Sequence, residues 1–434
     1  MRTARPDCLK CVTSGYRVDE SYNAYGDKHD KTSVVGCMKT LMGSPDRRKR
    51  AVGAAVLAAS ALFLSAACTV PSGNSATPVS EKAELPKPVI SKSQPDGAVG
   101  IDPLEPFTLA VSEGSLVNAT LTNLDGKVVE GEIAEDGKSF NTTEVLGYGR
   151  VYTLDAEAQG RGGTTTTSSQ FTTLQPNNLT MPFAMPWEGA VVGIGQPVRV
   201  QFDESIPNRK AAEDRITITT DPPVEGAFYW VNNTEVRWRP ENYWVPGTTV
   251  TVDVDVYGYD LGDGLYGEAN KSTTFTIGDS VIAIADDYSK TISIQVNGTV
   301  VRTMPTSFGK SSTPTPNGTY IIGDRQQSMI MDSSTYGVPV SSANGYRTRV
   351  EWATQMSYSG IYVHSAPWSL GDQGYRNVSA GCLNVSPANA QWFYYNTKPG
   401  DLVVVRNTVG GTLSGFDGLG DWNIPWSTWK AGNA

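Results

Sequence analysis

Short segments that alternate polar and apolar residues run through most of this chain, and their pattern recurs after about one hundred residues. Residues 170–174 (Gln-Phe-Thr-Thr-Leu) and 273–277 (Thr-Thr-Phe-Thr-Ile) end two successive units in the same way, with their phenylalanines 104 positions apart. In the second unit, valine occupies every second position from 250 to 256. Alternation with a period of two is typical of half-buried β-strands. The pattern therefore predicts a mainly β protein that contains a repeated unit.

The repeated units, residues 96–175 and 176–279, have the size of an immunoglobulin-like (Ig-like) β-sandwich. The first contains two Asp-Gly hairpin signals, at 125–126 and 136–137. In the second, residues 228–238 read as a hairpin in which aromatic and valine side chains share one face around an Asn-Asn turn. We expect two Ig-like sandwiches, without the cysteine pair that often links the two sheets.

Strand patterns continue through residues 280–406, where an Asn-Gly turn at 297–298 indicates a meander. One helix is expected, from Ser386 to about Thr397, because serine is a good N-cap and proline suits the first helical turn. Residues 407–434 are rich in tryptophan. We expect this C-terminal subdomain to pack back on the 280–406 unit.

The N-terminal region contains an export signal in an unusual position. Four basic residues at 47–50 precede an apolar run at 51–67, which is short for a spanning helix but suits a signal peptide. Small residues before Cys68 resemble a bacterial lipoprotein cleavage site. We expect residues 42–68 to be a lipoprotein-type signal peptide with lipidation at Cys68; ordinary cleavage and an uncleaved anchor are the alternatives. The protein would then be exported to the outer face of the cytoplasmic membrane and the cell wall.

Residues 1–41 do not belong in front of an export signal, which indicates that translation starts at Met38 or Met42. Their Cys-x-x-Cys pair lacks a convincing second pair, so we predict no metal site. Residues 69–95 are rich in Pro, Ser, Lys and Thr and are expected to form a flexible tether.

Charge and motif content exclude some classes of function. The formal net charge is −9, and no basic stripe with interleaved aromatic residues is present, which argues against a nucleic-acid partner. No glycine-rich phosphate loop stands out in the sequence, and we expect no cofactor.

The strongest chemical signal is a cysteine with one possible base. Once the signal peptide is removed, His364 is the sole histidine and Cys382 the sole unmodified cysteine. A cysteine nucleophile acts as a thiolate, which a nearby imidazolium favours, and it requires a base. The backbone N–H groups of residues 381–383 are candidates for an oxyanion hole. The alternative is structural: a small buried cysteine and a hydrogen-bonded core histidine.

The surrounding residues extend this signal. His364, a spacer of 14 residues, and Ser-Ala-Gly-Cys-Leu-Asn at 379–384 resemble the signature of the L,D-transpeptidase (YkuD-type) family, which is His, a spacer, and Ser/Thr-His-Gly-Cys-x-Asn. Residues 331–337, 344–347 and 421–426 look like the mycobacterial-type enzymes, which carry two Ig-like domains before a β-rich catalytic domain and a C-terminal subdomain. The resemblance covers residues from about 100 to 434.

The resemblance implies a peptidoglycan L,D-transpeptidase. Cys382 would attack the third residue, meso-diaminopimelate, of a tetrapeptide stem, release D-Ala and form a thioester, which the side-chain amine of an acceptor stem would convert into a 3→3 cross-link. His364 would be the base, oriented by the backbone carbonyl of Ser365. The implied substrate-binding residues are Tyr346, Met331, Tyr336, Ser359, Trp368, Ser379, Gly381 and Asn384. For Met331, Tyr336, Ser359 and Trp368, a packing role is an equal alternative. Carbapenem β-lactams are implied inhibitors that would acylate Cys382.

One residue departs from the family signature. Ala380 stands where the family has histidine, two places before the cysteine. The departure keeps other functions open: the same acyl-enzyme with water as acceptor (an L,D-carboxypeptidase), with a D-amino acid or a protein amine, or a weakly active peptidoglycan-binding paralogue.

Overall fold

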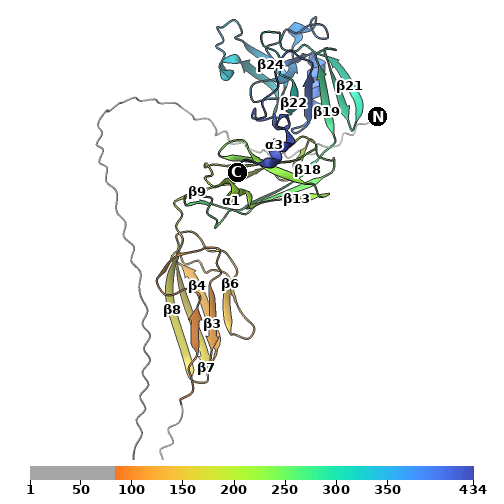
Figure 1. Ribbon diagram of the computed structural model, residues 1–434. Helices are drawn as coiled ribbons and strands as arrows, with labels where there is room; N and C mark the ends of the chain where they lie inside the picture. Colours follow the sequence, from red (N-terminus) through yellow and green to blue (C-terminus); the bar gives the residue numbers. More distant parts are fainter. Residues whose placement is uncertain (1–83) are drawn as a thin grey trace, which may run out of the picture. The chain divides into compact units, whose positions relative to one another are not determined.

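A computed structural model describes residues 84–434 of the chain (Figure 1). The segment 1–41, the expected signal peptide at 42–68 with Cys68, and most of the expected tether lie outside the described residues. Within residues 84–434, no helix is long and apolar enough to cross a membrane.

The first sandwich consists of two four-stranded sheets, ordered β1-β3-β6-β5 and β2-β8-β7-β4. Its strands are β1 (Val89–Lys92), β2 (Ala98–Ile101), β3 (Thr108–Ser112), β4 (Ser115–Asn123), β5 (Gly131–Ile133), β6 (Ser139–Thr142), β7 (Val151–Gly160) and β8 (Gly163–Thr173). Between the sheets, the rings of Phe107 and Phe171 stack at 5.2 Å, and Leu121 and Leu154 are fully buried.

Strand β1 corrects the expected start of this domain. The sequence composition places residues 89–92 in the tether, but they pair antiparallel with β3, and Ile90 packs against the core. The strand is short, lies at a sheet edge and has no fully buried residue. Its proline- and serine-rich surroundings therefore hid a weak strand pattern.

The second sandwich also has two four-stranded sheets, ordered β10-β12-β15-β14 and β11-β18-β16-β13. Its elements are β9 (Asn178–Thr180), β10 (Pro182–Met185), β11 (Val191–Val192), β12 (Val198–Phe202), α1 (Arg209–Glu213), β13 (Ile216–Asp221), β14 (Gly226–Trp230), β15 (Glu235–Pro240), β16 (Thr249–Val254), β17 (Leu265–Gly267) and β18 (Lys271–Ile277). The predicted hairpin is β14–β15, with Trp230 opposite Val236. The alternating valines from 250 to 256 are fully buried, because period-two alternation directs them all to the inner face.

Residues 280–406, the expected catalytic unit, are built on a five-stranded sheet, ordered β21-β20-β19-β27-β22, and a four-stranded sheet, β23-β24-β25-β26. Its elements are β19 (Val281–Asp286), β20 (Thr291–Val296), β21 (Thr299–Pro305), β22 (Gly318–Ile321), β23 (Arg325–Asp332), η1 (Ser333–Tyr336), β24 (Arg347–Gln355), β25 (Tyr362–Ser365), η2 (Pro367–Ser369), β26 (Leu383–Val385), α2 (Pro387–Asn396) and β27 (Leu402–Arg406). One core cluster contains residues of both sheets and of α2, among them Ile292, Val363 and Phe393.

Two local predictions in this unit are confirmed. The Asn-Gly turn joins β20 to β21, with positive φ at both Asn297 (49°) and Gly298 (81°), as a tight hairpin turn requires. The predicted helix is α2, and the Ser386 hydroxyl caps it by accepting a hydrogen bond from the backbone N–H of Asn389 at 3.3 Å.

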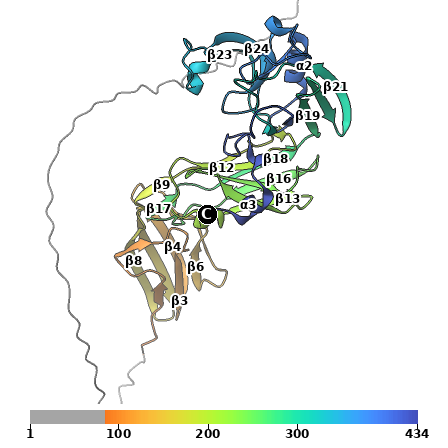
Figure 2. The same cartoon turned by 45° about the horizontal axis from the view of Figure 1, so that its top comes forward.

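The C-terminal elements, η3 (Asp421–Asn423) and α3 (Trp426–Ala431), do not pack as expected (Figure 2). Asn423 ties η3 to β22 through the carbonyl of Thr319 at 2.8 Å. Helix α3, however, packs on β14 of the second sandwich, where the fully buried Trp429 donates its indole N–H to the carbonyl of Ala227 at 2.8 Å. The expectation that the whole segment returns to the 280–406 unit is wrong, because the tryptophan pattern shows a need for burial but not which face provides it.

Candidate active site

Strands β25 and β26 bring the cysteine and the histidine to one cavity. They run parallel with His364 opposite Asn384, and Cys382 immediately precedes β26. The cavity has a volume of about 180 Å³ and opens to solvent. It is lined by Met331, Tyr346, Thr348, Val350, His364, Trp368, Val378, Ser379, Ala380, Cys382 and Asn384. Parallel pairing of two strands distant in sequence thus assembles the candidate nucleophile and base.

The His364 ring is buried and held by one backbone hydrogen bond. Its Nδ1 lies 2.9 Å from the carbonyl oxygen of Ser365, which can only accept, so Nδ1 carries the proton. The other ring nitrogen, Nε2, is then unprotonated and available as a base. Burial lowers the pKa of His364, which favours the neutral imidazole.

The Cys382 thiol is also buried. It donates to the backbone carbonyl of Gly360 at 3.5 Å, and burial raises its pKa to about 11. Burial of the two groups therefore opposes the expected pairing of a thiolate with an imidazolium. Burial disfavours the charged form of both groups, so the pair rests as a neutral thiol and a neutral imidazole.

A tight turn presents the cysteine. The Ser379 hydroxyl donates to the carbonyl of Cys382 at 2.6 Å and accepts from the N–H of Gly381 at 3.1 Å. Gly381 has a φ of 133°, a region that a side chain disfavours. The Gly381 N–H, expected as an oxyanion donor, is therefore engaged within the turn, and the structure gives Ser379 a role in shaping it.

Asn384 links the signature to the loop that follows β25. Its side-chain Nδ2 donates to the hydroxyl of Ser369 at 3.2 Å, while its backbone N–H and C=O pair with Ser307. Asn384 also lines the cavity, and its contact with Ser369 holds the first part of the loop at residues 366–381.

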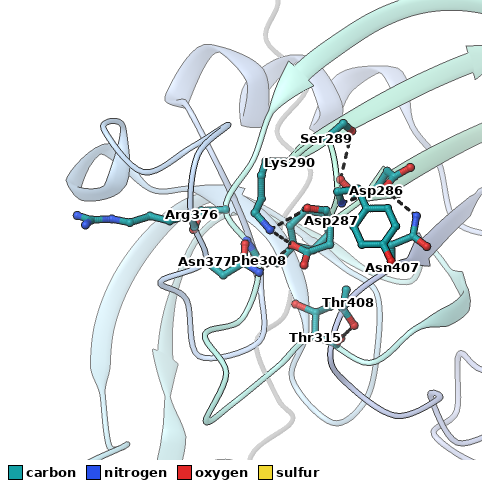
Figure 3. A network of polar contacts seen from close by, with 12 residues as sticks. Asp286, Asp287, Ser289, Lys290, Phe308, Thr315, Arg376, Asn377, Asn407 and Thr408 are labelled. Carbon is teal, nitrogen blue, oxygen red and sulfur yellow. Dashed lines mark hydrogen bonds and ion pairs between the residues drawn. The ribbon is translucent and has the colours of Figure 1, made fainter.

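A polar network holds the other end of that loop (Figure 3). The nearly buried carboxylate of Asp287 accepts from Nδ2 of Asn377 at 2.7 Å and from Nζ of Lys290 at 2.7 Å. The Ser307 hydroxyl also donates to the carbonyl of Arg376 at 2.8 Å. The approach to the nucleophile is therefore anchored to the turn between β19 and β20.

Of the expected substrate-binding residues, Met331, Tyr346, Trp368, Ser379 and Asn384 line the cavity. Trp368 is 57% exposed, and its ring lies 6.0 Å from that of His364, so it forms part of the rim. Burial raises the pKa of Tyr346 to about 12, which keeps its phenol protonated at neutral pH.

Tyr336 and Ser359 do not line the cavity. The Tyr336 ring lies against Gly360, and the Ser359 hydroxyl is 3.0 Å from that of Ser357. Ser359 belongs to the turn whose Gly360 carbonyl accepts the hydrogen bond from the Cys382 thiol, and Tyr336, the last residue of η1, packs against that turn.

Thr348, Val350 and Val378 line the cavity but were not expected to do so. Thr348 and Val350 are two positions apart on β24 and therefore lie on one face of the strand. This spacing could have identified them together as lining residues. Val378 lies in an irregular loop, where no periodicity identifies it.

Two family models match consecutive parts of the chain, and the first match spans parts of both sandwiches. Residues 98–260 match a family model described as a bacterial Ig domain, and residues 280–405 match the L,D-transpeptidase catalytic domain (YkuD). L,D-transpeptidase 2 of Mycobacterium tuberculosis (strain CDC 1551 / Oshkosh) is 60% identical over 352 residues, which cover 81% of this chain and 86% of that protein. L,D-transpeptidase 5 of M. tuberculosis (strain ATCC 25618 / H37Rv) is 34% identical over 368 residues, 82% of this chain and 80% of the relative.

Among solved structures, the LD transpeptidase LdtMt1 in complex with imipenem is 40% identical and matches 52% of this chain and 97% of its own, with a TM-score of 0.47. The family assignment rests on the sequence relatives, because both M. tuberculosis proteins are matched over at least 80% of their length. The chain therefore belongs to the L,D-transpeptidase family and is an enzyme of that class.

Proposed function

We propose that this enzyme forms 3→3 cross-links between peptidoglycan stems, with tetrapeptide donors and Cys382 as the nucleophile. One observation carries this proposal: the Cys382 thiol, the His364 ring and Asn384 line one cavity. The hydrogen bond at Nδ1 of His364 leaves Nε2 unprotonated. The 60% identity to an L,D-transpeptidase supports the reaction type.

In the first half-reaction, Cys382 Sγ attacks the carbonyl carbon of the third stem residue, meso-diaminopimelate. Because the resting thiol is neutral, His364 Nε2 takes its proton as the C–S bond forms. The C–N bond to D-Ala then breaks, His364 returns the proton to the leaving nitrogen, and a thioester remains. The Ser365 carbonyl supports this cycle because it keeps the other proton on Nδ1.

In the second half-reaction, the side-chain amine of an acceptor stem attacks the thioester carbonyl. His364 Nε2 takes a proton from that amine, the C–S bond breaks, and the departing sulfur recovers the proton as a thiol. Tyr346, which lines the cavity with a protonated phenol, donates its O–H to the oxyanion in both steps.

Product analysis tests this function. The purified protein is incubated with a disaccharide tetrapeptide, and the products are separated and weighed by mass spectrometry. We expect a cross-linked dimer that has lost one D-Ala, and no product from Cys382→Ala. Tripeptide alone would show an L,D-carboxypeptidase, incorporation of an added D-amino acid would show exchange, and binding without product would show a peptidoglycan-binding paralogue.

We also propose that carbapenems acylate Cys382, because one matched structure is an LD transpeptidase in complex with imipenem. Intact mass after incubation with imipenem should increase by one drug mass in the wild type and remain unchanged in Cys382→Ala. An unmodified wild type would count against a competent nucleophile.

For location, we propose an exported enzyme at the outer face of the cytoplasmic membrane, anchored through a lipid on Cys68. The support is the basic, apolar and small-residue sequence that ends at this cysteine. Mass spectrometry of the mature N-terminus should find a lipidated Cys68; an unmodified N-terminus at another residue would exclude the anchor.

A further inference from the structure

The turn between β24 and β25 determines where the thiol points. Its Gly360 carbonyl accepts from Cys382 Sγ at 3.5 Å. Gly360 has a φ of 95°, and a Cβ there would lie 2.5 Å from the Tyr336 ring, so this residue has little freedom to shift or to be replaced. The orientation of the nucleophile therefore depends on the position of this turn.

A carboxylate from the C-terminal segment holds the turn in place. Asp417 accepts two backbone hydrogen bonds, Oδ1 from Tyr358 N–H at 2.9 Å and Oδ2 from Ser359 N–H at 3.1 Å. Bonds to an ionised acceptor are stronger and shorter than neutral ones, so this bidentate contact fixes the turn firmly. Asp417 does not line the cavity, and its side chain contacts the turn that accepts the hydrogen bond from the thiol.

The segment that carries Asp417 is in turn held by the second Ig-like domain. Arg237 of β15 is 3% exposed, and its Nη1 donates to the carbonyl of Gly418 at 2.8 Å and to Asp421 Oδ2 at 2.6 Å. Its Nε pairs with Glu235 at 2.7 Å, which fixes the guanidinium from the opposite side. Tyr358 packs so closely on Gly418 that a Cβ there would lie 2.2 Å from its ring.

These contacts form a continuous set from the second Ig-like domain to the nucleophile. We propose that Asp417 is a positioning residue for Cys382, and that Arg237 holds the segment at residues 417–421 against the turn at residues 357–360. The inference rests on the proposed role of Cys382 as the nucleophile. It gives the second Ig-like domain a part in the catalytic geometry.

Two readouts that move in opposite directions test the proposal. Asp417→Ala should lower kcat for the disaccharide tetrapeptide by about tenfold to a hundredfold, with KM within about threefold, because the thiol is displaced from the attack geometry. The same variant should raise the rate constant for iodoacetamide labelling of Cys382 by about threefold or more, because a loosened turn exposes the buried thiol. Asp417→Asn keeps one acceptor oxygen, so its kcat and its labelling rate constant should lie between those of Asp417→Ala and the wild type.

Asp279→Ala is the matched control, since this carboxylate lies in the linker between β18 and β19 and accepts a side-chain hydrogen bond from Asn297 on the exposed surface. It should leave both rates unchanged. Unchanged labelling in Asp417→Ala, or a parallel fall in kcat and labelling, would overturn the proposal. If the wild type shows no turnover, the proposed function fails, and the labelling rates still decide whether Asp417 positions Cys382.

Arg237→Lys tests the second part of the proposal, because lysine keeps the charge but cannot reproduce the forked contacts. It should lower kcat, and the double variant Asp417→Ala/Arg237→Lys should lose no more activity than Asp417→Ala, as expected for residues that act through one path. Additive losses would show that Arg237 acts by another route.

Discussion

At the scale of single residues, burial governs the state of the nucleophile and the base. It raises the pKa of Cys382 to about 11 and lowers the pKa of His364, so neither group is charged at neutral pH. The residue types and their spacing in sequence could identify this pair. Their neutral state could not be predicted, because it depends on burial by distant parts of the chain.

The pH dependence of thiol reactivity follows from this state. The thiolate fraction of Cys382 should increase about tenfold per pH unit and level off only near the pKa of about 11. Rates of iodoacetamide labelling between pH 6 and pH 11 measure it directly. A plateau already reached at pH 7 would indicate a thiolate–imidazolium pair instead.

Ala380 offers a second test at this scale. Its side chain lines the cavity and is exposed, so a larger residue fits there without displacing the core. We expect Ala380→His to raise kcat for the tetrapeptide donor by at least about fivefold, because an added transition-state hydrogen bond contributes about 1–3 kcal/mol. Equal steady-state rates for variant and wild type would show that the position tolerates alanine without loss.

At the scale of elements, the sequence predicts helices and turns correctly where all the residues that define them are close together in the chain. The α2 helix has its cap and proline in adjacent positions, and the turn at 297–298 needs no distant partner, so both could be predicted from the sequence. Strand β1 and helix α3 could not be placed correctly, because an edge strand and a tryptophan-rich helix are defined by the surface that receives them.

The turn before β26 gives a prediction at this scale. Ser379→Ala removes a donor to the Cys382 carbonyl and an acceptor for the Gly381 N–H. We expect kcat to fall and the free energy of unfolding to decrease by about 1–3 kcal/mol, because two buried backbone groups lose their partner. Steady-state kinetics and urea unfolding measure the two effects. Ser342→Ala, at an exposed position, is the control, and equal behaviour of the two variants would contradict the role given to Ser379.

At the scale of the whole described unit, the C-terminal segment joins the catalytic unit to the second sandwich. Trp429 is fully buried against β14, and the Arg239 guanidinium lies 4.4 Å from the centre of its ring. Arg237 and Asp421 form a buried ion pair in the same region. Composition predicted that the tryptophans are buried, but the pairing of these two arginines with the C-terminal segment becomes visible only in the folded chain.

Removal of the buried indole tests this connection. Trp429→Ala should decrease the free energy of unfolding by about 3–5 kcal/mol, as a large cavity in a packed core does. Trp187→Ala, at a residue that is 65% exposed, should change it by less than about 0.5 kcal/mol. Urea unfolding followed by circular dichroism measures both variants, and similar midpoints would contradict the packing role of α3.

The proposed reaction requires Cys382 to carry the donor stem as a thioester. The most direct measurement is rapid acid quenching of the enzyme with a tetrapeptide donor, followed by intact mass and peptide mapping. We expect an adduct equal to the donor acyl group without its terminal D-Ala, located on the peptide that contains Cys382 and missing in Cys382→Ala. An adduct on another residue, or product formation by Cys382→Ala, would contradict it.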